Sequence, residues 1–142
     1  MKPNLGFYVQ KINDIVQDTE AIGGDMHPCF EEIREAIDTD KIETVTDERR
    51  AEIVAIFEEG TQKYQAMQQT VSALRPPARV MGIHKKFERA YTEYVEGCVE
   101  MIASIKEGIN VEAFNASEQK QDEATEIIAF SIQRMTGLLL GK

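Results

Sequence analysis

The sequence predicts an all-α protein, an antiparallel up-and-down bundle of three to four long helices. Apolar residues recur every three or four positions over most of the chain, which places them on one stripe of a helix. No stretch alternates apolar and polar residues for long enough to indicate a β-strand. Short breaks containing Pro, Gly or Asn separate the stripes, and short connections favour antiparallel neighbours.

The first arm of the bundle is predicted over residues 4–38, with a break in its middle at Gly23-Gly24 and Pro28. Its apolar stripe consists of Leu5, Tyr8, Ile12, Ile15, Thr19 and Ile22. Gly23-Gly24 is suited to close a helix, and Pro28 can begin a second, shorter one. Two alternatives follow. The arm is either one long helix kinked at the break, or two separate short helices packed over one end of a three-helix bundle.

The next two helices, over residues 46–75 and 78–109, have the clearest spacing. The first stripe consists of Ile53, Phe57, Gly60, Tyr64, Met67, Val71 and Leu74. The second consists of Val80, His84, Phe87, Tyr91, Tyr94, Cys98, Met101 and Ile105. Pro76-Pro77 separates the two helices, because proline cannot continue a helix interior. A tight turn there would place Gly60 opposite Tyr94, a missing side chain facing a large ring.

The last helix is predicted over residues 111–141, with Asn110 as its N-cap, while Thr46 or Asp47 caps the helix at 46–75. The first half of the last helix, residues 115–126, has almost no apolar surface. This half is either a solvated extension or a surface that faces something polar. Whether the core beside Glu118 and Gln121 is filled or hollow distinguishes a protein-interaction module from a bundle that binds a small ligand.

Size and charge narrow the class of protein. Residues 1–142 are predicted to form a single helical-bundle domain, since a chain of this length can bury a sufficient core. Sixteen Lys and Arg against 25 Asp and Glu give a net charge of −9, which disfavours nucleic acid and anionic membranes as partners. The N-terminus lacks the uninterrupted apolar run of a signal peptide. We therefore expect a cytoplasmic protein, unless a signal or lipoprotein anchor precedes this sequence.

His84 is the first candidate for chemistry, because it lies on an apolar stripe where a bundle would place Leu. It is a candidate metal ligand or proton-transfer group, with Glu88 one turn further on. A carboxylate-bridged di-metal bundle has Glu-x-x-His on two helices, and this sequence has none. No metal centre and no cofactor are therefore predicted. The sequence also has no Gly-rich phosphate loop and no Cys-x-x-Cys, which predicts a protein that is not an enzyme.

A basic segment is the second candidate. Residues 75–89 carry five basic side chains and one acidic side chain in an otherwise acidic chain. They predict a ligand- or anion-binding site made of Arg75, Arg79, His84, Lys85, Lys86 and Arg89. If the break in the first arm lies at the same end of the bundle, His27 comes close to His84. The alternative is a solvated face that balances acidic neighbours.

Cys29 is the third candidate. If Pro28 begins a helix, Cys29 lies in its first turn, where the helix dipole favours a thiolate and hence a reactive thiol. The alternative is a small buried apolar residue beside Phe30. Cys98 lies on an apolar stripe and is expected to be a buried, inert thiol.

Two functions from different classes fit these patterns. The first is a non-enzymatic protein-interaction or regulatory module that binds another protein or itself, with Leu138, Leu139 and Leu140 as the predicted dimer contact. The second is a small-ligand or metal-binding bundle that uses His84 with Tyr91, Tyr94 and the polar half of the last helix. The predicted helical hairpin, broken by a Leu-x-Pro-Pro turn and followed by a histidine, is similar to that of many small bacterial bundle proteins. This similarity implies no function.

Overall fold

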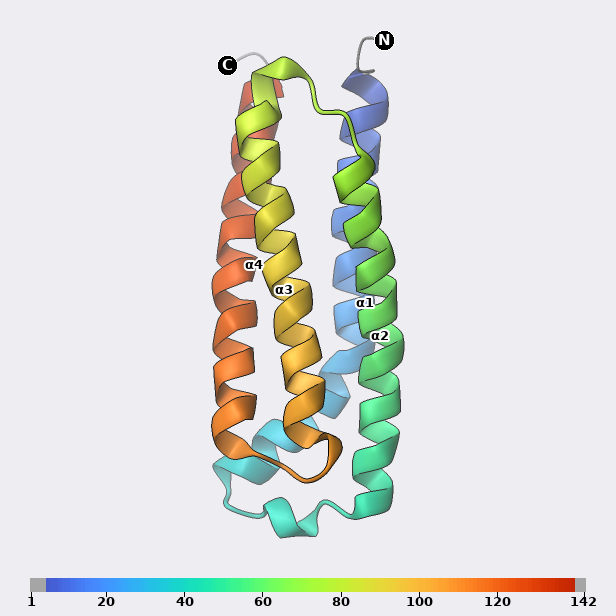
Figure 1. The fold of residues 1–142 in the computed structure, drawn as a ribbon, viewed down its shortest axis with the longest axis vertical. Helices are drawn as coiled ribbons and strands as arrows, with labels where there is room; N and C mark the ends of the chain where they lie inside the picture. The colour runs from blue at the N-terminus through green and yellow to red at the C-terminus, as the bar shows by residue number, and fades with distance from the viewer. Residues whose placement is uncertain (1–4, 140–142) are drawn as a thin grey trace.

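The computed structural model describes residues 5–139 as four long helices joined by short connections (Figure 1). The helices are α1 (Leu5–Asp38), α2 (Asp47–Ala73), α3 (Met81–Lys106) and α4 (Val111–Leu139). Their directions alternate along the bundle, so the start of α1 and the end of α4 lie at the same end (Figure 1). The all-α antiparallel bundle is confirmed, and the described part of the chain contains no strand. Among these residues, no helix has the length and apolar character needed to cross a membrane.

α1 is one helix of 34 residues that runs through the predicted break. Gly23-Gly24 does not close it, and Pro28 lies inside it instead of beginning a second helix. Pro28 has no N–H to donate to the carbonyl of Gly24, and a proline at such a position bends a helix without ending it. Figure 1 shows this bend, since the last part of α1 turns away from the axis of the first part. The kinked-arm alternative is therefore confirmed.

Two of the helix starts are capped as predicted. The Thr46 hydroxyl oxygen accepts a hydrogen bond from the Arg49 N–H at 3.0 Å, so Thr46 and not Asp47 is the N-cap of α2. The Asn110 side-chain oxygen accepts one from the Ala113 N–H at 3.0 Å at the start of α4. Each cap satisfies an N–H that has no partner within the helix.

The register between α2 and α3 differs from the predicted one. Tyr94 packs edge-on against Tyr64, with ring centroids 5.2 Å apart, and Tyr64 lies one helical turn beyond Gly60. The predicted pair of Gly60 and Tyr94 is therefore wrong. The reason lies in the connection, which is longer than a tight turn because residues 74–77 are extended and Ala78–Val80 form a 3-10 turn. Gly60 faces α1 instead, where its nearest side chain is Met26.

The core consists of two clusters, one toward each end of the bundle. The cluster near the start of α1 is built around Tyr8, Tyr64, Phe87, Tyr91 and Met135. The cluster at the opposite end is built around Ile33, Ile53, Phe57, Ile105 and Phe114. α3 packs closely on both α2 and α4, and α1 packs on α2. The backbones of α1 and α4 do not pack closely on each other, so the seam between them is the loosest in the bundle.

Gly97 and Gly60 make a matched pair for a stability test. A Cβ at Gly97 would lie 2.8 Å from Gln121 Cγ and 3.4 Å from the backbone of α4. Gly97→Ala is therefore expected to lose about 1–3 kcal/mol to crowding, offset by about 1 kcal/mol of helix propensity. A Cβ at Gly60 would overlap the Met26 thioether, which has to shift. Because that side chain is flexible, Gly60→Ala should cost less than Gly97→Ala or keep the free energy of unfolding. Urea denaturation followed by circular dichroism measures both, and equal changes in the two variants would contradict the close α3–α4 contact.

Candidate functional site

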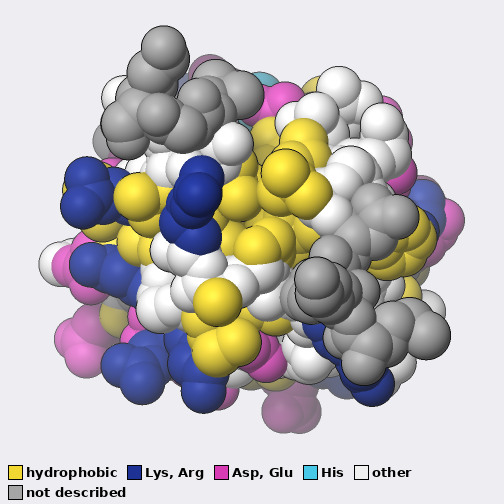
Figure 2. Space-filling view, turned by 90° about the horizontal axis from the view of Figure 1, so that it is seen from above, with side chains coloured by type: hydrophobic (Ala, Val, Ile, Leu, Met, Phe, Trp, Pro, Cys, Tyr) yellow, Lys and Arg dark blue, Asp and Glu magenta, His cyan; other side chains and the backbone are white. Residues whose placement is uncertain are grey.

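The predicted basic site is spread over exposed surface. Its exposed members are Arg75, Arg79, Lys85, Lys86 and Arg89. The Arg79 guanidinium donates to the Leu138 carbonyl at 3.2 Å, and the Lys86 ammonium lies 4.9 Å from the centre of the Phe130 ring. Figure 2, which looks onto this end of the bundle, shows Lys and Arg side chains mainly along one side of an apolar centre. Anion binding by these residues stays a prediction.

His84 does not join the basic side chains, because it points into the bundle. Its side chain is buried, and its Nδ1 lies 2.7 Å from the Tyr8 hydroxyl oxygen. Burial lowers the pKa of His84, which keeps the imidazole neutral at neutral pH. His27 lies about five turns beyond Tyr8 along α1 and is exposed next to Glu31. The expected approach of His27 to His84 is therefore wrong, because α1 continues past the predicted break.

Cys29 and the C-terminal leucines are the remaining predicted site residues. Cys29 is buried in the interior of α1 and not in the first turn of a helix, so the helix dipole that was to activate its thiol is absent. Leu138 and Leu139 are half-buried against the core cluster near the start of α1, and Leu140 lies outside the described residues. A dimer contact through these leucines stays a prediction.

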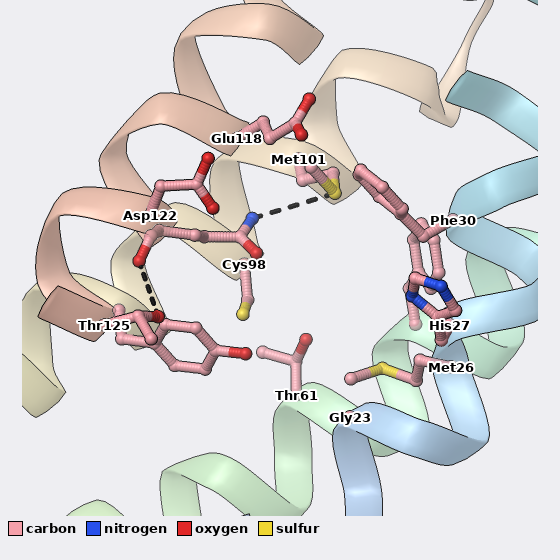
Figure 3. Close-up of a pocket in the computed structure, with 13 residues that line it drawn as sticks. Gly23, Met26, His27, Phe30, Thr61, Cys98, Met101, Glu118, Asp122 and Thr125 are labelled. Atoms are coloured by element: carbon pink, nitrogen blue, oxygen red, sulfur yellow. Dashed lines mark hydrogen bonds between the residues drawn. The ribbon is translucent and has the colours of Figure 1, made fainter. Parts of the chain in front are cut away.

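The region beside Glu118 and Gln121 is hollow. A cavity of about 300 Å³ lies there between α1 and α4, with α2 and α3 forming its floor. We call it the polar compartment. Its polar lining is His27, Thr61, Glu118, Gln121, Asp122 and Thr125. Its aromatic and sulfur-containing lining is Met26, Phe30, Phe57, Tyr94, Cys98 and Met101. Figure 3 shows these side chains converging on the cavity from all four helices.

A second hollow, the apolar compartment, adjoins the first along the same seam. Its volume is about 500 Å³. Its apolar lining includes Ile15, Val16, Phe87, Ile128, Ala129 and Ile132. The two compartments share Gly23, Tyr94 and Thr125. Together they form what we call the α1–α4 groove.

Both ends of the α1–α4 groove are closed by contacts between the two helices. At one end Phe30 stacks on Phe114, with ring centroids 5.7 Å apart, and Arg34 of α1 forms an ion pair with Glu118 of α4. At the other end the Tyr8 hydroxyl donates to the Met135 sulfur at 3.1 Å. The helices are therefore fastened at two places, and the groove lies between them.

The sequence explains why the middle of the seam stays open. Residues 115–126 of α4 carry no large apolar side chain that could fill the space. On the other side of the seam, α1 contributes Gly23, which lines both compartments and has no side chain. Neither helix supplies the bulk that close packing needs.

The hydroxyl and thiol groups at the groove are held neutral. Burial raises the pKa values of Tyr91 and Tyr94 to about 12, and that of the Cys98 thiol to about 12 as well. The Tyr91 hydroxyl bonds to the Thr19 hydroxyl at 2.8 Å, and the Tyr94 hydroxyl donates to that of Tyr64 at 3.4 Å. Groups of this kind hydrogen-bond and orient, but a nucleophile or a general base needs a pKa closer to the working pH.

Comparison with protein-family models, with curated protein sequences and with solved structures found no match for this chain. Within residues 5–139, no three His, Cys, Asp or Glu side chains gather closely enough to hold a metal ion. What the groove can do therefore follows from its own geometry.

The structure brings together part of the predicted ligand site. Tyr91, Tyr94 and the polar half of α4 meet at the groove, whereas His84 lies elsewhere in the core. Met26 and Thr61 in the polar compartment, and Val16, Ala129 and Gln133 in the apolar one, are lining residues that the sequence does not single out. The position of Thr61, directly after Gly60 on the apolar stripe of α2, could have indicated that it is buried. Only the fold shows that it faces a cavity.

Proposed function

We propose that this protein is a non-enzymatic binding module that takes a small, mostly apolar molecule into the α1–α4 groove. One observation carries the proposal. The bundle is closely packed toward both ends, yet the seam between α1 and α4 is hollow in the middle. Close packing is the rule in protein interiors, so a gap that reaches the buried side chains of Thr61, Tyr91 and Cys98 is a candidate binding site. Of the two functions that fit the sequence, this geometry favours the small-ligand bundle, with its site moved from His84 to the groove.

The size and lining of the groove support this function. Cavities that bind small molecules commonly measure about 300–1,000 Å³ and combine an apolar wall with a few polar groups. The α1–α4 groove has an apolar compartment, a polar compartment and two methionines, Met26 and Met101. Methionine side chains adapt to the shape of a ligand. The neutral Tyr and Cys groups described above support binding without catalysis.

Filling the apolar compartment should abolish binding. Ala129 is exposed on α4 and lines this compartment, so the ring of Ala129→Phe would occupy the space of the ligand. We expect the neutral dye N-phenyl-1-naphthylamine to bind the unchanged protein saturably, with increased fluorescence. Ala129→Phe should weaken this binding about tenfold or more, a loss of about 1.4 kcal/mol or more.

The matched control is Ala116→Phe, which adds the same ring at an exposed position of α4 outside the groove. It should bind the dye as the unchanged protein does. Thermal denaturation followed by circular dichroism checks that both variants remain folded. The proposed function is wrong if the dye does not bind saturably, or if the two variants weaken its binding equally.

A further inference from the structure

We propose that the ligand of the α1–α4 groove is an amphiphilic cation, with its hydrocarbon part in the apolar compartment and its ammonium group beside Asp122 and Thr61 in the polar compartment. This inference rests on the proposed function and adds the chemical class of the ligand. It follows from the unused hydrogen-bonding groups of the cavity, from the charges around it and from the way the two compartments adjoin.

Thr61 is the buried polar group that points to a ligand. Thr61 is 4% exposed, and its hydroxyl makes no hydrogen bond to any residue of the described chain. Several other threonines of these helices donate to the carbonyl four residues earlier, as Thr70, Thr92 and Thr125 do. Figure 3 shows the Thr61 hydroxyl directed into the polar compartment. Its oxygen is open to the cavity, since the enclosed side-chain atoms without a partner in the described residues are Arg50 Nε and Ser131 Oγ. A ligand in the cavity can therefore bond to it with little competition from water.

The polar compartment offers several unused hydrogen-bond acceptors, although the Thr61 hydroxyl and the His27 imidazole in its lining can also donate. The Gln121 amide nitrogen already donates to the Gly97 carbonyl at 3.1 Å, which leaves the amide oxygen free to accept. Two donors beside it are occupied, because the Thr125 hydroxyl donates to the backbone carbonyl of Gln121 at 2.8 Å and the Tyr94 hydroxyl donates to Tyr64. A ligand that matches these groups therefore brings donors, and an ammonium group has donors and no acceptor.

The charges around the groove favour the same chemistry. Neither compartment is lined by a Lys or Arg, whereas Glu20, Glu118 and Asp122 line them. The charge of Glu118 is balanced by Arg34. Asp122 is exposed at the mouth of the polar compartment and has no ion pair with any described residue. A cation there gains a carboxylate partner, and an anionic amphiphile such as a fatty acid would be repelled.

One molecule can use both compartments at once. They adjoin at Gly23, Tyr94 and Thr125, so a hydrocarbon chain in the apolar compartment can continue into a head group in the polar one. Gly23 contributes no side chain at this junction. Burying the chain supplies affinity, and the acceptors of the polar compartment select the head group.

Three amphiphiles with the same chain test this inference: octylammonium, octanol and octanoate, each used to displace the dye from the full chain. We expect octylammonium to bind about three- to tenfold more tightly than octanol, and octanoate to bind most weakly. Asp122→Asn should reduce octylammonium binding to about the level of octanol and leave octanol unchanged. Glu123→Gln is the matched control, because it removes the same charge one residue away from the cavity lining and should change neither.

Thr61→Val gives a second readout that a structural role would not produce. It should weaken octylammonium binding about threefold, while the melting temperature of the free protein stays the same or rises, since an unpartnered hydroxyl is removed. The inference is overturned if octanol or octanoate binds as tightly as octylammonium, or if Asp122→Asn and Glu123→Gln act alike. In those cases displacement of the dye still supports a binding groove, whereas a dye that never binds overturns the proposed function itself.

Discussion

Phe114→Ala is expected to lower the free energy of unfolding by about 3–5 kcal/mol. The Phe114 ring is fully buried at the start of α4, where it stacks on Phe30 of α1. The Arg34 guanidinium lies 5.4 Å from the centre of the same ring. Removing the ring therefore leaves a cavity and also loosens one of the two fastenings between α1 and α4. Urea denaturation followed by circular dichroism measures the loss.

Phe130→Ala is the control for this prediction. Phe130 also lies on α4 but is 51% exposed, so its truncation should change the free energy of unfolding by only about 0.5 kcal/mol. Similar losses in the two variants would mean that α1 and α4 are not fastened at Phe114. Dye binding adds a second measurement, since opening this end of the groove should weaken the binding of an apolar ligand.

His84→Ala is expected to cost about 2–4 kcal/mol at about pH 7.5, because it creates a cavity and removes a hydrogen-bond partner of Tyr8. The same variant should lose part of the pH dependence of stability. Burial lowers the pKa of His84 below its ordinary value of 6.5, so below that pH the unfolded state binds more protons than the folded one. The stability contributed by neutral His84 is therefore present above 6.5 and is lost as pH falls toward the folded pKa.

The measurement is the free energy of unfolding at several pH values between about 7.5 and 5.5. The unchanged protein should lose stability over this range, and His84→Ala should lose less. His27→Gln is the control, since His27 is the other histidine of the chain and is exposed on α1. It should keep the pH dependence of the unchanged protein. If His27→Gln flattens the curve and His84→Ala does not, the buried neutral state of His84 is wrong.

The sequence predicts most of the fold because helix spacing and caps are local properties. The spacing of apolar residues gives four helical arms close to the observed ones, and Asn110 and Thr46 cap as expected. The sequence leaves the course of α1 open, because Gly23-Gly24 and Pro28 are compatible with both a bend and an end of the helix. The predicted register between α2 and α3 is wrong, because the register depends on the path of residues 74–80. The spacing of apolar residues contains no information about that path.

The candidate site could be predicted only in part. The sequence shows that the first half of α4 lacks apolar bulk, but it leaves open whether the core beside it is filled or hollow. Tyr91 and Tyr94 reach the groove as the ligand-site hypothesis required. His84 could not be placed, because an inward histidine satisfied by Tyr8 and one that binds a ligand have the same position on a stripe. The role of Thr61 could not be predicted, because it depends on whether its hydroxyl finds a hydrogen-bond partner. That becomes visible only when all four helices are placed.

The loose seam between α1 and α4 also has a kinetic consequence. Helices that follow one another along the chain form hairpins with short loops, whereas α1 and α4 meet only when almost the whole chain has closed on itself. Contacts of such long range form late in folding, and interactions formed after the transition state act mainly on the rate of unfolding. A molecule held in this seam would therefore prolong the lifetime of the native state far more than it would hasten its formation.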